Sequence, residues 1–317
     1  MSIIRIKEST TADVMNDDLV YKVGDDRKRT TAREWYRGEV TNFIPSKLNL
    51  TEEGAVEKYV LHGWLPEAPL INSETYVTAF GSCFAQYIRK HLIDKAKLTH
   101  SIEDHQPFPI VNNGEAINTT FAILQQFLWA WDNASFDEKW FDDKMNLVIP
   151  TEDTRLQTKE AFDKTDVFIL TLGLSEIWYD AVTGQVFWRG IPHDIYDPSR
   201  HMFRVSTVGE NKGNLTKIVK LIKKHNPKAK IIFTLSPVPL NATFRPVSCI
   251  TANSVSKAIL RVSVDEVMRE NQGLFYWPAY EIVTSFFADS YREDNRHPKD
   301  EVIQFILDTF SKHYVAV

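Results

Sequence analysis

The fold is decided by the stretch Tyr76-Val77-Thr78-Ala79-Phe80-Gly81-Ser82-Cys83-Phe84-Ala85. Its first five residues are β-prone, and Gly81 suits a tight turn. Beyond the turn, apolar residues recur with helical spacing up to Leu92. The stretch therefore predicts a strand, a tight turn and a helix, which is the repeating unit of an α/β fold.

Strands and helices alternate along the rest of the chain. Nearly continuous apolar runs, typical of parallel strands buried on both faces, predict strands at 166–172 and 230–235, with a short one at 274–277. Apolar periodicity predicts helices at 116–131, around 215–222, at 253–270 and around 302–310. This alternation implies crossover connections and a parallel sheet with helices on both faces.

Residues 1–70 have no clear period and read as an irregular N-terminal extension that packs on the main domain, 71–317. Within the extension, the run Asp25-Asp26-Arg27-Lys28-Arg29 is expected to be a solvated charged loop. The segment 132–150 holds polar and aromatic residues without a period, and is expected to be a loop or a small excursion.

Composition excludes several classes of protein. A formal net charge of −5 argues against a nucleic-acid binder, which normally carries a basic face. No run approaches the roughly 20 apolar residues that span a bilayer, and the N-terminus lacks the apolar run of a signal peptide. Two cysteines are too few for a disulfide framework. The expected location is the cytoplasm, where thiols stay reduced.

Polar turns follow three of the predicted strands. They are Gly81-Ser82-Cys83, Gly173-Leu174-Ser175-Glu176 and Ser236-Pro237-Val238-Pro239. Ligands of open parallel sheets bind beyond the carboxyl ends of the strands, so these turns are expected to meet at one edge. Asp294 and His297 lie just before the last helix, in a loop that can return to the same edge.

Cys83 is the preferred nucleophile. It stands at the start of a predicted helix, where backbone N–H groups and the helix dipole favour a thiolate. His297 is the expected base and Asp294 the residue that orients it. Two alternatives stay open: Ser82 is the nucleophile, or Cys83 is a small buried residue beside a Ser82 helix cap.

These residues carry a resemblance to the GSCFA family, named for the five residues that stand here as Gly81 to Ala85, within the wider SGNH (GDSL-like) hydrolase group. The likeness continues through the segments 171–178, 234–240, Ser256-Lys257, 278–282 and 294–298. It implies a three-layer α/β/α sandwich with a five-stranded parallel sheet in the flavodoxin-like order. It also implies acyl-ester chemistry. Laid on the group's Gly-Asp-Ser turn, Cys83 takes the nucleophile's place and Ser82 that of the aspartate. Asp294 and His297 match the Asp-x-x-His pair.

Two departures concern the oxyanion. The group's third block is Gly-x-Asn, whose amide donates to the oxyanion, whereas this chain has Gly173-Leu174-Ser175. Ser175 is expected to donate in its place, with shorter reach, and the loss of such a donor costs about 100- to 1000-fold in turnover. The nearest match to the second-block glycine is Gly114. Glu176 either assists the site or pairs with a nearby base, and Ser236 is a further candidate substrate contact.

The loop after the 166–172 strand carries several basic residues: Arg189, His193, Arg200, His201 and Arg204. They either contact an anionic substrate or the phosphates of an acyl donor, or belong to a solvated polar loop. No histidine or cysteine cluster has metal-ligand spacing, and no glycine-rich phosphate loop is present. The expectation is an enzyme without a cofactor, with acyl-CoA or another acyl thioester as a possible donor substrate.

Three functions remain. The leading hypothesis is transfer of an acyl group, most simply acetyl, to a hydroxyl of a glycan through a covalent acyl-enzyme. The second is an esterase or deacetylase that acts on a carbohydrate or a lipid. The third is a non-catalytic glycan-binding or scaffolding domain that keeps the fold without its chemistry.

Overall fold

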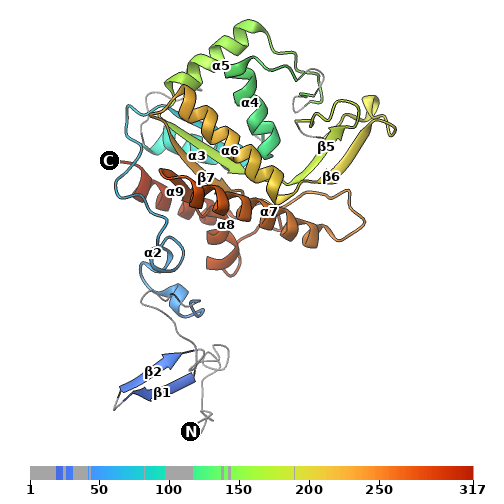
Figure 1. Ribbon diagram of the computed structural model, residues 1–317. Coiled ribbons are helices and arrows are strands. Elements are labelled where there is room, and N and C mark those ends of the chain that lie inside the picture. Colours follow the sequence, from blue (N-terminus) through green and yellow to red (C-terminus); the bar gives the residue numbers. More distant parts are fainter. Residues whose placement is uncertain are drawn as a thin grey trace. The chain divides into compact units, whose positions relative to one another are not determined.

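A computed structural model gives the fold (Figure 1). It describes residues 19–23, 26–30, 42, 44–81, 83–96, 117–136, 139–141, 144–188 and 190–316. The chain divides into two compact units, Met1–Gly63 and Trp64–Val317. From the sequence, the main domain was expected to start at residue 71. Leu70 and Ile71 both donate backbone hydrogen bonds to the carbonyl of Tyr314, near the other end of the second unit.

The first unit contains an antiparallel hairpin of β1 (Leu19–Val23) and β2 (Asp26–Thr30), followed by a 3₁₀ turn at Asn49–Thr51 and α2 (Ala55–Tyr59). The expectation of a charged loop at 25–29 is therefore wrong for Asp26 to Arg29, which form most of β2. A hairpin strand made of charged residues has no apolar alternation, so periodicity could not reveal it.

The second unit is built on a parallel sheet. Its strands are β3 (Val77–Phe80), β4 (Val167–Leu172), β7 (Lys230–Leu235) and β8 (Leu274–Trp277), in the order β3-β4-β7-β8. All three pairings are parallel. Five strands were expected, but the described residues form four. The order equals the flavodoxin-like order 2-1-3-4-5 without its second strand. Residues 97–116, between β3 and β4, lie outside the described residues.

Side chains of alternate residues divide the sheet into two faces. Phe168 and Leu170 of β4 belong to the large apolar core. The same core takes in residues of α4 (Thr120–Asp132), α6 (Val208–His225) and α7 (Cys249–Glu270), which pack side by side. The ring of Trp277 contacts α9 (Asp300–Tyr314) instead, and α9 packs with α3 (Cys83–Ala96). The predicted three-layer α/β/α sandwich is confirmed (Figure 1).

Several elements had no clear signal in the sequence. α5 (Glu152–Lys164) packs on α4, yet it buries only Thr158, Ala161 and Phe162, too few for a visible apolar stripe. An antiparallel hairpin of β5 (Glu176–Asp180) and β6 (His201–Val205) follows β4 directly. A 3₁₀ turn at His193–Ile195, α8 (Ala279–Glu281) and a π-helical turn at Ile282–Phe286 complete the described elements. None of the helices in the described ranges is long and apolar enough to cross a membrane.

Candidate active site

The turn between β3 and α3 requires glycine at position 81. Gly81 has φ +128°, a conformation that residues with a side chain rarely adopt. A Cβ there would run into the carbonyl oxygen of Thr171 on β4 and lie 2.5 Å from the Thr171 Cβ. The predicted strand, turn and helix are confirmed, and α3 begins at Cys83. Ser82 and Gly114 lie outside the described residues.

Asp294 and His297 form a hydrogen-bonded pair. The ring Nδ1 of His297 lies 2.5 Å from Asp294 Oδ2, while Asp294 Oδ1 accepts from the backbone N–H of His297 (2.9 Å) and of Arg296 (3.0 Å). The hydrogen bond from the His297 ring has the largest effect and the two backbone hydrogen bonds add to it. Together they hold the pKa of the Asp294 carboxyl well below its ordinary value. The His297 side chain is 30% exposed. In the described part of the chain nothing bonds its Nε2, so the pair suits a general base.

The loop that carries this pair docks on the end of β7. Tyr291 donates from its hydroxyl to the carbonyl of Pro237 (3.0 Å), and Arg296 donates from Nε to the carbonyl of Pro239 (3.4 Å). Pro237 and Pro239 lie two and four residues beyond Leu235, the last residue of β7. The structure thus brings the Asp294–His297 pair to the sheet edge at which β3 and β4 also end.

A buried lysine joins the turns after β4 and β7. Lys257 of α7 is 2% exposed, and its Nζ donates to the carbonyls of Gly173 (3.0 Å), Ser236 (2.8 Å) and Val238 (2.8 Å). An ammonium group has three N–H bonds, one for each carbonyl. Burial lowers the pKa of Lys257 to about 7, and the nearby Arg296 acts in the same direction. Lys257 therefore fixes the backbone at this edge of the sheet.

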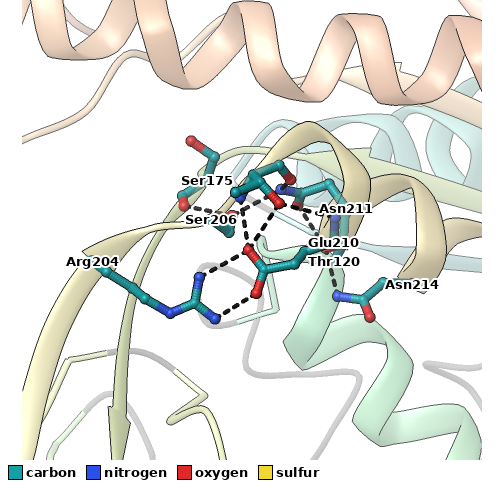
Figure 2. A network of polar contacts seen from close by, with 8 residues as sticks. Thr120, Ser175, Arg204, Ser206, Glu210, Asn211 and Asn214 are labelled. Atoms are coloured by element: carbon teal, nitrogen blue, oxygen red, sulfur yellow. Dashed lines mark hydrogen bonds and ion pairs between the residues drawn. The ribbon is translucent and has the colours of Figure 1, made fainter.

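Ser175 lies inside the protein. It is fully buried, and its backbone N–H and its hydroxyl both donate to Oγ of Ser256, at 2.9 and 3.2 Å. Its carbonyl accepts from the backbone N–H (2.8 Å) and the hydroxyl (2.7 Å) of Ser206 (Figure 2). A hydroxyl held in this way, away from the surface, does not suit the oxyanion role expected for Ser175.

Ser236 also shapes a turn. It is almost fully buried, its backbone N–H donates to Leu172, and its Oγ accepts from the N–H of Val238 at 3.3 Å. Gly173 has a different neighbour. Its N–H donates to the carbonyl of Asn118 (2.7 Å), and a Cβ at position 173 would lie 3.0 Å from the Asn118 Cβ. Gly173 therefore lets Asn118 approach the end of β4 closely.

A small cavity of about 140 Å³ opens beside the end of β4. Aromatic rings form much of its wall, with Asn118, Thr119, Leu174 and Glu176 among its polar and apolar neighbours. The rings belong to Trp178, Phe187, Trp188, Phe203 and Phe244. Glu176 accepts a hydrogen bond from the hydroxyl of Thr243 (2.9 Å), and burial raises the pKa of its carboxyl. A basic partner was expected for Glu176 from the sequence. Arg245 acts on the Glu176 carboxyl in this way, at longer range.

A larger cavity, about 400 Å³, lies at the other end of α4 and is lined by residues such as Trp129, Phe136 and Arg155. Because α4 begins beside Gly173 and runs for 13 residues, this cavity is about 15–20 Å from the turns described above. It takes no part in the candidate site.

The sequence matches a known protein family over the segment that contains the β3–α3 turn and the Asp294–His297 pair. The GSCFA family model matches residues 76–310, which include both. The chain belongs to the GSCFA family. No curated protein sequence matches it.

Solved structures resemble this GSCFA chain only distantly. One is a protein named as a GDSL-like lipase from Parabacteroides merdae, with 12% identity, coverage of 78% of this chain and 98% of that one, and a TM-score of 0.41. Another is a carbohydrate esterase family 3 protein from Talaromyces cellulolyticus, with 11% identity, 75% and 95% coverage, and a TM-score of 0.32. An acetyl xylan esterase from Butyrivibrio proteoclasticus has 12% identity, 76% and 64% coverage, and a TM-score of 0.32. Likeness at this level says nothing about activity.

The basic residues of the β5–β6 region of the GSCFA chain are held by protein groups. Arg200 pairs with the buried Asp180 (2.6 Å), whose pKa is lowered by Arg200 first and by Lys139 as well. Arg204 makes two hydrogen bonds to Glu210, at 2.6 and 2.9 Å (Figure 2). The buried His201 accepts at Nδ1 from the backbone N–H of Asp197. His193 is exposed, and Arg189 lies outside the described residues. These contacts favour a structural role.

Two residues of the site had not been assigned a role from the sequence. Lys257 lies on the same face of α7 as Leu260, Val264 and Val267. A lysine within an apolar stripe was the available signal for a buried ammonium. Asn118 gave no signal of its own, because only the fold brings it beside Gly173. Within the described residues, no group of three or more His, Cys, Asp or Glu side chains suits a metal ion.

Proposed function

We propose that the protein performs acyl-ester chemistry through a covalent acyl-enzyme on Cys83, with transfer of a small acyl group to a glycan hydroxyl as the leading reaction. The observation that carries the proposal is the Asp294–His297 pair. It is oriented by three hydrogen bonds to Asp294 and docked at the carboxyl edge of the sheet, where the Gly81 turn starts α3. A nucleophile, a base and an orienting carboxylate are the requirements of such a reaction.

The first half-reaction forms a thioester. Sγ of Cys83 attacks the carbonyl carbon of the acyl donor while Nε2 of His297 accepts the thiol proton, and the carbonyl π electrons move onto oxygen. The tetrahedral intermediate collapses as the bond to the leaving group breaks. His297 returns its proton to the departing oxygen or sulfur, so an alcohol or a thiol leaves. Asp294 stabilises the doubly protonated ring between the two transfers.

The second half-reaction regenerates the thiol. A hydroxyl of the acceptor attacks the thioester, His297 takes its proton and then returns it to Sγ, and an acylated product leaves. Water in place of the acceptor gives the free acid, which is the esterase reaction. The wall of the cavity beside β4 is mainly aromatic, and its acidic member, Glu176, disfavours an anion. The cavity therefore suits an uncharged group of the substrate. No cofactor is required by these steps.

The test is acylation by an activated ester. Exposure to 4-nitrophenyl acetate should add one acetyl group to the wild-type protein, and intact mass followed by peptide mapping should place it on Cys83. Cys83→Ala should abolish the adduct, whereas Ser82→Ala should keep it. An adduct on Ser82 alone would make the serine the nucleophile.

A second measurement separates the three functions. With an acetyl thioester as donor and a xylo- or cello-oligosaccharide as acceptor, a transferase should yield acetylated sugar, and an esterase mostly acetate. If the folded protein bound the oligosaccharide but formed no adduct on either residue, the enzymatic proposal would be lost in favour of a glycan-binding domain.

A further inference from the structure

We propose that the side-chain amide of Asn118, and not the hydroxyl of Ser175, is the side-chain hydrogen-bond donor to the oxyanion. The inference rests on the proposed function, because it concerns the negative charge that develops on the substrate oxygen during acylation. Donors that are already aimed at such a charge are among the strongest sources of rate enhancement in enzymes.

Ser175 cannot reach a substrate from its observed position. Its side chain is fully buried, and its hydroxyl donates to Ser256 on α7. The backbone on both sides is held as well, by Ser256 at the N–H and by Ser206 at the carbonyl. Turning the hydroxyl toward the surface would break its buried hydrogen bond to Ser256 and leave that group without this partner, which is unfavourable.

Asn118 lies next to the turn after β4. It precedes α4, at the end of β4, and its carbonyl accepts from the N–H groups of Gly173 (2.7 Å) and Leu174 (3.2 Å). A Cβ at position 173 would lie 3.0 Å from the Asn118 Cβ and 3.6 Å from its Cγ, so the amide group itself stands against Gly173. Asn118 also lines the aromatic cavity. It is thus the amide that borders both the turn and the cavity.

The Asn118 backbone is held from several sides. The peptide between Gly173 and Leu174 donates its N–H to Asn118 and offers its carbonyl to Lys257 at 3.0 Å. The next residue, Thr119, caps α4 by accepting from the N–H of Ala122 at 3.1 Å. All of these anchors use the backbone of Asn118 or the groups next to it. A change of its side chain therefore leaves these backbone anchors in place.

The test compares Asn118→Ala, Asn118→Asp and Ser175→Ala in the 317-residue chain, with 4-nitrophenyl acetate as substrate. Asn118→Asp keeps the shape of the side chain but loses its N–H donors. Both Asn118 variants should lower kcat about 100- to 1000-fold and leave KM within about threefold. Thermal unfolding checks that both variants remain folded. Ser175→Ala should keep kcat within about threefold and unfold at a lower temperature.

Opposite results overturn the inference. If the wild type is active and either Asn118 variant keeps kcat within threefold, Asn118 is not the donor. A folded Ser175→Ala protein with a hundredfold lower kcat would return the role to Ser175. If the wild type forms no acyl-enzyme with this ester, the proposed function fails, and the inference fails with it. Intact mass of the wild type distinguishes that case from the first two.

Discussion

The carboxylate of Asp294 accepts three hydrogen bonds, all from within four residues of chain. Two come from backbone N–H groups and one from the His297 ring. The side-chain pair is therefore set by a local turn, which also contains Asn295 in the left-handed region (φ +52°). Such a turn is why the Asp-x-x-His spacing could be recognised from sequence. A carboxylate on Nδ1 selects the ring tautomer in which Nε2 can accept a proton.

Asp294→Asn should lower kcat by about two to four orders of magnitude, with KM little changed, because an amide no longer orients the ring nor stabilises its charged form. Steady-state hydrolysis of 4-nitrophenyl acetate measures both constants. Asp289→Asn is the matched control, since Asp289 is an exposed carboxylate that pairs with Lys299 in the same region. Equal kcat values for the two variants would exclude Asp294 from the mechanism.

Glu176→Gln tests a buried carboxyl. Burial raises the pKa of Glu176, so the folded protein holds this proton more tightly than the unfolded chain. The resulting stability is present below the unfolded pKa of about 4.3 and is lost as the pH rises through the folded value. The glutamine variant keeps an acceptor for Thr243 and carries no charge. It should therefore unfold on the order of 2 °C above the wild type at pH 7 and at the same temperature near pH 4.

Scanning calorimetry at the two pH values measures this difference, and kcat at pH 7 should stay within about threefold. A large loss of kcat without a change in KM would instead make Glu176 a catalytic group. A gain in stability that persisted at pH 4 would contradict the raised pKa.

Among the elements, the β3–α3 turn was the most predictable, because two separate constraints require a glycine at position 81. The positive φ of Gly81 and the contact with Thr171 each exclude a side chain. The strands at 167–172 and 230–235 were equally clear, since both are buried along nearly their whole length. The β5–β6 hairpin was not predictable, because Glu176 to Asp180 mixes charged and aromatic residues straight after a strand.

Gly81→Ala should destabilise the protein by about 3 kcal/mol or more, from a disfavoured backbone conformation together with the clash on β4. Gly184→Ala separates the two causes. Gly184 also has a positive φ (+71°), but nothing lies within 4 Å of its Cβ position, so the cost there should be about 1 kcal/mol. Urea unfolding monitored by tryptophan fluorescence gives both values. Equal costs would mean that the approach of β3 to β4 is looser than the structure shows.

On the scale of the whole molecule, the parallel sheet does most to assemble the site. It explains why three turns far apart in sequence could be expected at one edge, since parallel strands that pair in register end together. Lys257 and Asn118 show where that reasoning stops. Both belong to elements on the helical layer, α7 and the segment before α4, and only their packing against the strand ends sets their partners. A spacing in the sequence carries no such information.

The 317-residue sequence contains two thiols, Cys83 and Cys249, and each is the first residue of a helix. A helix N-terminus alone would activate both to a similar degree. They differ in surroundings: Cys249 is partly buried and its Sγ donates to the carbonyl of Leu240 (3.7 Å), whereas Cys83 follows the Gly81 turn at the edge where the Asp294–His297 pair docks. If His297 acts as the base, Cys83 alone should gain reactivity.

Iodoacetamide at pH 7 should therefore alkylate Cys83 at least about tenfold faster than Cys249, and loss of esterase activity should follow the first label. Intact mass counts the labels, and peptide mapping assigns them. Cys249→Ser should behave as the wild type does, because it removes only the slow thiol. In His297→Ala the two rates should approach each other. Activity that survives complete alkylation of Cys83 would identify Ser82 as the nucleophile. Faster labelling of Cys249 would show that the Cys83 thiol, at the start of α3, is not part of the active site.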